Sequence, residues 1–244
     1  MTGRRPISLG EIASRLEHRL YLTEATPKAI GEEYALTTRH GLSSVIVRPE
    51  VVSTVGLRSA GTLMGIVSVP GWCENDVRPL STHELLTEAR RLVGDGATEV
   101  GLLADASRLK GDQGLRFVDS ASSLVGAMRD HGARVRVVLD TDNLTPDDTV
   151  AVCHRLASTG AWLVQGGSWL GARTSLTRIQ LMRGSLPPHV RLKWTSPIRT
   201  LDAMLICIAE GVDRFNGDPA TLLSEAARRI ELGSLVVPVR GVDY

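Results

Sequence analysis

Gly132-Ala-Arg-Val-Arg-Val-Val-Leu139 joins an amphipathic helical stretch to a short run rich in β-branched residues. A glycine just past a helix can adopt the left-handed conformation that closes the last turn, so this segment is typical of a helix C-terminus followed by a strand. The same order, often with a small residue after the glycine, recurs at four places and more weakly at two others: Gly41, Gly96, Gly160, Gly211, Gly61 and Pro187-Pro188. The sequence therefore predicts seven helix-to-strand junctions.

A further strand is predicted before the first junction, at His18 to Leu22, which brings the predicted strands to eight. Strands that alternate with helices pair in parallel, because each crossover needs a dozen or more residues. Eight units of roughly 28 residues match the size of a (β/α)8 barrel, or TIM barrel. An open doubly wound sheet is the structural alternative, but the sequence shows neither a glycine-rich dinucleotide fingerprint nor a P-loop.

We therefore predict an α/β protein with a single TIM-barrel domain over residues 1–244. A short helical segment is expected at about 8–16, and an apolar tail at about 235–244. This tail is compatible with packing across a barrel end or against a second copy in a homodimer.

The composition is that of a soluble globular protein, with 43% hydrophobic and 23% charged residues and a net charge of +1. No apolar run reaches the ~18 to 20 residues of a membrane helix, and no signal segment follows the start, so we expect a cytoplasmic protein without membrane contact. The absence of a basic block argues against nucleic-acid binding. Three cysteines without paired spacing predict neither disulfides nor a zinc site. The expected partner is a small-molecule substrate.

Lysine is scarce: the chain has 25 arginines but only Lys28, Lys110 and Lys193. Arginine is not deprotonated in proteins, so chemistry that needs a nucleophilic amine must use one of these three. Lys28 and Lys110 have surface contexts. Lys193 ends a predicted strand before Trp194, where burial would lower its pKa and make it a base or an imine-forming amine. The alternative is a buried structural ion pair with Asp140 or another loop carboxylate.

The active site of such a barrel lies where strands end and the following loops begin. The polar and aromatic residues expected there are Arg48, Ser68, Trp72, Asp105, Asp140, Asp142, Gln165, Ser168, Trp169, Lys193, Trp194, Ser196, Asn216 and Asp218. Asp140 and Asp142 could act as acid and base or hold a divalent cation, with strand-end capping as the alternative. The backbone amides before Ser168 could hold an anion, although the composition is also that of an ordinary loop. The six histidines lack metal-binding spacing.

Several of these segments together resemble the deoxyribose-phosphate aldolase family, over about residues 16–229. The segments that carry the resemblance are Glu17-His-Arg-Leu20 with Thr23-Glu-Ala-Thr26, Val45-Ile-Val-Arg-Pro49, Glu99-Val-Gly-Leu-Leu103, Val137-Val-Leu-Asp-Thr141 with Leu144-Thr145, Gly160-Ala161, and Lys193 with Ile198-Arg-Thr200. The resemblance implies the (β/α)8 fold of class I aldolases, which form a Schiff base through a lysine on the sixth strand.

The residues that carry the family's chemistry differ in this chain. The Schiff-base lysine matches Gln165, and an amide nitrogen cannot form that imine. The catalytic aspartate of the fourth strand matches Gly101, with Asp105 four residues on as a partial replacement. The family's second lysine matches Lys193, which is retained.

The family's phosphate site also differs. Its paired glycines match Ser196-Pro197, and proline removes a backbone donor. Its glycine and serine after the eighth strand match Asn216 to Pro219, where Asp218 would repel a phosphate. A glycine and a lysine after the sixth strand match Trp169 and Leu170.

The first functional hypothesis is an aldolase-like enzyme for a non-phosphorylated, apolar or aromatic carbonyl substrate, of carbon–carbon lyase, cyclase or isomerase type, in a specialised biosynthetic pathway and without a cofactor. Lys193 would be a general base, an electrostatic stabiliser or a relocated Schiff-base amine, and Asp140 would tune its pKa. Gln165 would bind a carbonyl oxygen, and Asp105 or Asp218 would move protons. Three tryptophans would line the pocket: Trp72, Trp169 and Trp194.

Two alternatives stand beside it. The chain could be a catalytically inactive aldolase homologue that acts as a binding or partner protein, because the imine lysine and the fourth-strand aspartate are both replaced. A weaker alternative is a metal-dependent enzyme that uses Asp140, Asp142 and Asp218. Classical deoxyribose-phosphate aldolase activity is not expected.

Overall fold

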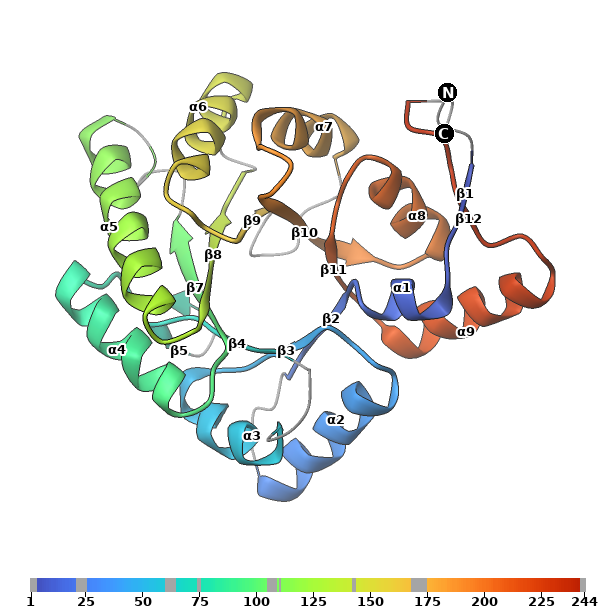
Figure 1. The fold of residues 1–244 in the computed structure, drawn as a ribbon, viewed down its shortest axis with the longest axis horizontal. Coiled ribbons are helices and arrows are strands. Elements are labelled where there is room, and N and C mark those ends of the chain that lie inside the picture. The colour runs from blue at the N-terminus through green and yellow to red at the C-terminus, as the bar shows by residue number, and fades with distance from the viewer. Residues whose placement is uncertain are drawn as a thin grey trace.

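A closed barrel of parallel strands forms the centre of the protein (Figure 1). The computed structural model describes residues 4–20, 26–59, 65–73, 76–104, 109, 111–141, 144–167 and 175–241. Within these ranges eight parallel strands close into a barrel in the order β10-β11-β2-β3-β4-β7-β8-β9. They are β2 (Leu16–Arg19), β3 (Ser44–Ile46), β4 (Gly65–Ser68), β7 (Glu99–Ala104), β8 (Arg134–Leu139), β9 (Leu163–Gly167), β10 (Arg191–Ile198) and β11 (Arg214–Gly217). The predicted (β/α)8 barrel is confirmed.

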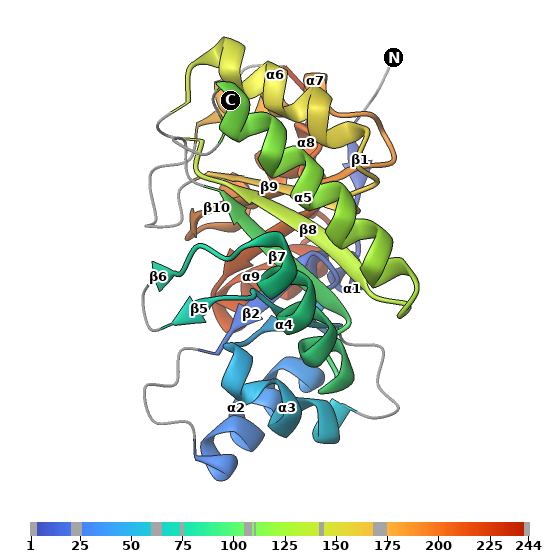
Figure 2. The same ribbon diagram turned by 90° about the vertical axis from the view of Figure 1, so that its left-hand side faces the viewer.

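Helices form a ring outside the barrel (Figures 1 and 2). They are α2 (Pro27–Arg39), α3 (Val52–Ser59), α4 (Thr82–Gly94), α5 (Gly111–Arg129), α6 (Pro146–Ala157), α7 (Leu176–Ser185), α8 (Leu201–Ala209) and α9 (Pro219–Glu231), with a 3-10 turn η1 (Pro49–Val51) before α3. Side chains cap the starts of α2, α4, α6, α7, α8 and α9. Ser81 and Glu84, for example, form a reciprocal capping box at α4.

The glycines that predicted the junctions have the backbone conformation that the prediction requires. Positive φ angles of 66°, 112°, 70°, 81° and 90° occur at Gly41, Gly96, Gly132, Gly160 and Gly211. Each follows the end of a helix and precedes a barrel strand, which is the C-cap geometry that glycine adopts without strain. Gly61, one of the weaker junctions, lies outside the described residues.

The two ends of the described chain lie side by side. Strand β1 (Arg5–Pro6) pairs antiparallel with β12 (Val236–Val237), beside helix α1 (Leu9–Ala13) (Figure 1). The predicted helical segment at 8–16 is shorter than expected, because Leu16 already belongs to β2. The apolar tail supplies β12, and Val237 is buried there.

The strand register decides which side chains point into the barrel. Residues paired in register lie on the same face of the sheet, and successive residues point to opposite faces. Gln165 pairs with Lys193, and Lys193 pairs with Arg214. These three side chains therefore share the inner face, while Trp194 and Phe215 share the helix-facing side. No helix among the described residues is long and apolar enough to cross a membrane.

Candidate active site

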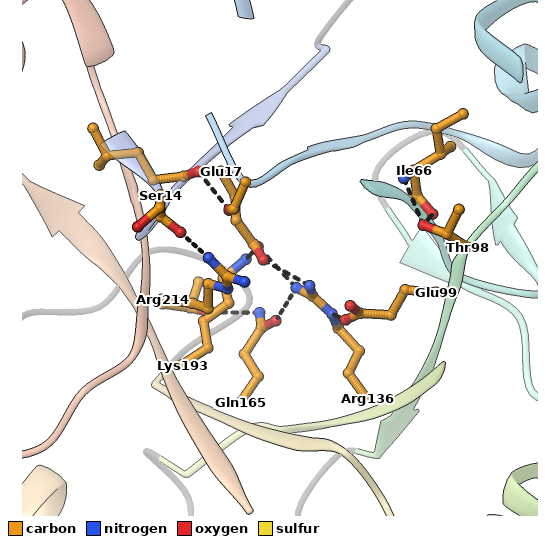
Figure 3. A network of polar contacts seen from close by, with 12 residues as sticks. Ser14, Glu17, Ile66, Thr98, Glu99, Arg136, Gln165, Lys193 and Arg214 are labelled. Carbon is orange, nitrogen blue, oxygen red and sulfur yellow. Dashed lines mark hydrogen bonds and ion pairs between the residues drawn. The ribbon is translucent and has the colours of Figure 1, made fainter. Parts of the chain in front are cut away.

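The interior of the barrel holds a network of charged and amide side chains from five strands (Figure 3). Its members are Glu17 on β2, Glu99 on β7, Arg136 on β8, Gln165 on β9 and Lys193 on β10, and each is at most 3% exposed. Buried charges at this depth are tolerated only where opposite charges and hydrogen bonds compensate them. The network supplies that compensation.

Lys193 lies where the sequence predicts it, inside the barrel, with its side chain fully buried. Its ammonium forms an ion pair with the carboxylate of Glu17. Burial lowers the pKa of Lys193 to about 7, against the opposing attraction of Glu17.

The partner of Lys193 differs from the loop carboxylate that the sequence suggested. The strand order puts β2 only one strand away from β10, across β11, so Glu17 reaches Lys193. Asp140, the expected partner, comes directly after β8, is half-buried and donates its backbone N–H to the Ala104 carbonyl at 3.2 Å. The ion pair is therefore made within the strands of the barrel, by Glu17.

Arg136 holds the two carboxylates of the network together. Its Nη2 and Nη1 donate to the two oxygens of Glu17 at 2.7 and 2.9 Å, and its Nε donates to Glu99. Burial alone would lower the pKa of Arg136, but Glu17 and Glu99 outweigh burial and raise it. Burial alone would likewise raise the pKa of Glu17, but Arg136 and Lys193 hold it far below its ordinary value. Both groups therefore stay ionised.

Gln165 is bonded at both ends of its amide. Its Oε1 accepts from Arg136 Nη1 at 3.3 Å, and its Nε2 donates to Thr195 Oγ1 at 2.5 Å. The amide is thus fixed in orientation directly beside Lys193, its partner in register. The structure brings together Lys193 and Gln165 among the predicted catalytic residues.

Gly101 is required by close packing inside the barrel. A Cβ atom at this position would lie 2.7 Å from Val69 Cγ2 and 3.7 Å from Arg136 Cγ. Val69 therefore occupies the space that a longer side chain at position 101 would need.

Two predicted binding residues face the helices instead of the barrel mouth. Ser68 pairs in register with Val100, and Trp194 with Phe215, so both lie on the outer side of their strands. Strand alternation explains the error, because Lys193 points inward and its neighbour Trp194 must point outward. Among the described residues, neither Ser68 Oγ nor Trp194 Nε1 has a hydrogen-bond partner, and both are buried.

Trp72 covers part of the inner face of the barrel. It belongs to the hairpin β5 (Trp72–Cys73) and β6 (Asp76–Val77), which projects at one end of the barrel (Figure 2). The Trp72 side chain is 7% exposed and packs with Ile46, Val67 and Val69. The guanidinium carbon of Arg19 lies 5.6 Å from the centroid of its ring. This position is compatible with the predicted pocket lining.

The remaining described candidates lie at strand ends and have mixed surroundings. Arg48 is half-buried and pairs with Glu50 at 3.5 Å, while Ser196 is buried. Asn216 pairs in register with Glu17 on the inner face, and its buried Oδ1 lacks a hydrogen-bond partner in the described part of the chain. Asp218 caps α9, accepting from Ala220 N at 3.1 Å and from the Thr221 hydroxyl, which lowers its pKa.

Four predicted site residues lie outside the described residues: Asp105, Asp142, Ser168 and Trp169. Their roles stay predictions, and so does the metal-dependent alternative, because Asp142 is one of its ligands. Within the described ranges no group of three or more histidine, cysteine, aspartate or glutamate side chains is placed to hold a metal ion.

Glu17, Glu99 and Arg136 are central to the network, and the prediction did not include them as site residues. Part of the signal is present in the sequence, because Arg136 alternates with valines in β8 and Glu99 begins the apolar strand β7. Glu17 has no such signal, since His18 and Arg19 follow it in β2. A charge at such a position in a barrel must point inward and must find a partner there.

No family model matches the chain. The chain is 26% identical to a deoxyribose-phosphate aldolase of Coccidioides immitis over 221 residues, which cover 89% of this chain and 81% of the relative. It is 25% identical to a deoxyribose-phosphate aldolase of Rhodospirillum rubrum over 229 residues, which cover 93% and 94%. A solved structure of deoxyribose phosphate aldolase from Aeropyrum pernix superimposes with a TM-score of 0.77 at 18% identity, covering 91% of this chain and 93% of that one. Over most of its length the chain is therefore similar to proteins named deoxyribose-phosphate aldolase, and it shares the TIM-barrel fold.

Proposed function

We propose that the protein is an aldolase-type carbon–carbon lyase for a carbonyl substrate without a phosphate group, with Lys193 as its reactive amine. The observation that carries the proposal is the pairing of a fully buried lysine, whose pKa is lowered to about 7, with the Glu17 carboxylate at the centre of the barrel. An amine with such a pKa is substantially neutral at physiological pH, which is the form that attacks a carbonyl carbon.

The chemistry follows from the two charges. Above about pH 7 the Lys193 ammonium releases its proton to water, and the neutral nitrogen attacks the carbonyl carbon of the substrate. Loss of water gives a protonated imine, whose positive charge the Glu17 carboxylate stabilises. The β-hydroxyl group of the substrate then gives its proton to water, and the bond between the α and β carbons breaks. Its electron pair moves into the imine to form an enamine, and the β fragment leaves as a free carbonyl compound. Protonation of the enamine and hydrolysis release the product and return the amine.

Glu17 acts in this scheme as a fixed negative charge. Its low pKa makes it a poor proton acceptor, and Arg136 keeps it oriented through two hydrogen bonds. Gln165 stands where the resemblance places a lysine, so an amide lies beside Lys193 instead of a second amine. We assign Gln165 to binding the substrate oxygen, for which its side chain would rotate away from Thr195.

The preference for a substrate without phosphate rests on the start of α9. Helix N-termini bind phosphates through free backbone N–H groups and the helix dipole. Here Asp218 already caps the helix, and Pro219 provides no N–H at the first helical position. An anionic carboxylate at this place opposes a second anion. Trp72, buried against the inner face, favours an apolar group on the substrate.

Borohydride trapping tests the proposal. The protein is incubated with a panel of aldehydes and ketones, in phosphorylated and unphosphorylated forms, and then reduced with borohydride. Peptide mass spectrometry is expected to find the adduct at Lys193, mainly from unphosphorylated compounds. Lys193→Met must lose the adduct, while Lys28→Met, a change at an exposed lysine, must keep it. Adducts only at Lys28 or Lys110, or none at all, would overturn the proposal.

A binding protein without turnover is the second candidate, because the side chains of the network already bond to one another. Lys193 has no exposed surface, and its ammonium is engaged by Glu17. In this case calorimetry would detect a carbonyl ligand that binds Lys193→Met and the parent protein with the same Kd, and no borohydride adduct would form.

A further inference from the structure

The amino-terminal end of the barrel, opposite the mouth, carries a cluster of arginines around one tryptophan. Trp162 precedes β9, and Arg134, Arg191 and Arg214 are the first residues of β8, β10 and β11. Their guanidinium carbons lie 4.1, 5.7 and 5.8 Å from the centroid of the Trp162 ring. We call these three arginines with Trp162, together with Arg15 just before β2, the basic floor.

Among the described residues, Asp213 is the one carboxylate within 4.0 Å of a guanidinium of the basic floor. Its oxygens lie 4.0 Å from Arg15 Nη1 and 3.7 Å from Arg191 Nη1, and 3.9 Å from a third arginine, Arg183. These distances are longer than hydrogen-bonded ion pairs. Asp213 Oδ2 instead accepts the Leu192 backbone N–H at 2.9 Å. The floor therefore carries several cations around one nearby carboxylate, while Glu17 of the barrel interior also acts on Arg214.

Arg134 and Arg214 have no acidic partner within the described ranges. Arg134 stacks on Trp162, and Arg214 donates to the Ser14 carbonyl (Figure 3). The Nε of Arg214 is buried without a hydrogen-bond partner there. Burial first, and then the neighbouring Arg191, lower the pKa of Arg214, while Glu17 opposes both. An anion close to the floor would relieve this repulsion.

The floor is accessible to a ligand from solvent. The Arg191 side chain is 48% exposed, Arg134 is exposed, and Trp162 is partly exposed. A guanidinium presents several N–H donors in a planar fork that matches phosphate oxygens, and the aromatic ring holds the guanidiniums in position through cation–π contacts. Stacking on Trp162 accounts for the placement of these arginines, but it does not neutralise their charge.

We propose that the basic floor binds a small anion that carries several phosphate groups. The floor faces solvent at the amino-terminal end of the barrel, where Arg191 precedes Lys193 by two residues and Arg214 pairs with Lys193 in register. Arg134 and Arg191 take no part in the proposed aldolase chemistry, so the anion site does not depend on it. Phosphate fits because planar guanidiniums converge from three strands, and because binding would add several charge-assisted hydrogen bonds at once.

The proposal is tested with sodium tripolyphosphate, whose binding is measured by calorimetry and by thermal unfolding. At ten times the Kd the melting temperature is expected to rise by roughly 3 to 6 °C. The double variant Arg134→Gln/Arg191→Gln should weaken binding by about a hundredfold, or about tenfold for each arginine. The control Arg90→Gln/Arg116→Gln removes the same charge from exposed positions on α4 and α5, and it should leave the Kd unchanged.

The result that would overturn the proposal is no binding at 10 mM tripolyphosphate, or equal weakening in the test and control variants. A comparison with ATP then shows whether the ligand is a phosphate chain alone or a nucleotide. If ATP binds like tripolyphosphate, the floor recognises a phosphate chain. If ATP binds more tightly and Trp162→Leu removes the difference, the ligand is a nucleotide whose base stacks on Trp162.

Discussion

The barrel interior and the basic floor both contain buried or partly buried cations, but they differ in their charge balance. Inside, Arg136 and Lys193 face Glu17 and Glu99, and each cation has a carboxylate within hydrogen-bond contact. On the floor, Asp213 stands 4.0 Å from Arg15 and 3.7 Å from Arg191, and it stands 3.9 Å from Arg183 outside the floor. The two clusters differ in the placement of their carboxylates, and we expect the interior cluster to hold the fold and the floor to be able to hold a ligand.

The largest effect is expected from Glu17→Gln, because this change leaves Arg136 and Lys193 facing each other in the interior. Removing one partner of a buried ion pair typically costs about 3 to 5 kcal/mol of unfolding free energy. Urea unfolding at pH 6 would measure it, with Glu50→Gln at an exposed position as the control. A loss of unfolding free energy below about 1 kcal/mol would show that the stability of the fold does not depend on the interior carboxylates.

The next largest effect is expected in the pH dependence of the unfolding free energy, which should reveal the buried Lys193 of the interior. The pKa of Lys193 is about 7 in the folded protein and about 10.4 when unfolded, so the unfolded state binds more protons between these values. The Lys193 contribution therefore becomes less unfavourable as pH rises above about 7, by at most about 1.4 kcal/mol per pH unit. The stability of the parent relative to Lys193→Met, measured by urea unfolding at pH 6, 7, 8 and 9, should rise accordingly. A constant difference would contradict the lowered pKa.

A smaller loss is expected from Gly101→Ala, because the added methyl group would lie 2.7 Å from Val69. Overpacking of this kind costs about 1 to 3 kcal/mol, and Val69→Ala in the same chain should recover part of it. Gly126→Ala in α5, where no atom lies within 4 Å of the new methyl group, is the control and should stabilise the protein by about 0.5 to 1 kcal/mol. Equal behaviour of the two variants would show that the interior packing is loose.

The smallest effect is expected on the floor. Arg134→Gln and Arg191→Gln each remove a cation that has solvent access, so each should change the unfolding free energy by at most about 1 kcal/mol without added anion. With tripolyphosphate present the parent should become more stable than either variant. A loss of several kcal/mol of unfolding free energy without the anion would show that the floor arginines stabilise the fold, as the interior network does.

The fold could be predicted from local sequence because each junction has its own signal, as the positive φ angles of Gly96 and Gly132 show. The inward position of Lys193 agrees with the prediction, but Lys193 does not end its strand, because β10 continues to Ile198. Its partner could not be predicted, because Glu17 is 176 residues away and meets Lys193 only when the barrel closes. Trp194 and Ser68 were assigned to the mouth because they lie near strand ends, whereas strand alternation places them under the helices. Four further candidates, among them Trp169, lie outside the described residues.

Barrel closure also sets an order of events during synthesis of the chain. Glu17 is made 119 residues before Arg136 and 176 residues before Lys193, and β2 finds its neighbour β11 only when residues near 215 have been made. Until then Glu17 can remain hydrated, and it loses its water only when both cations are available. The desolvation of Glu17 is thereby postponed until the two halves of the sheet meet, and we expect a nascent chain that stops short of β10 to leave Glu17 hydrated.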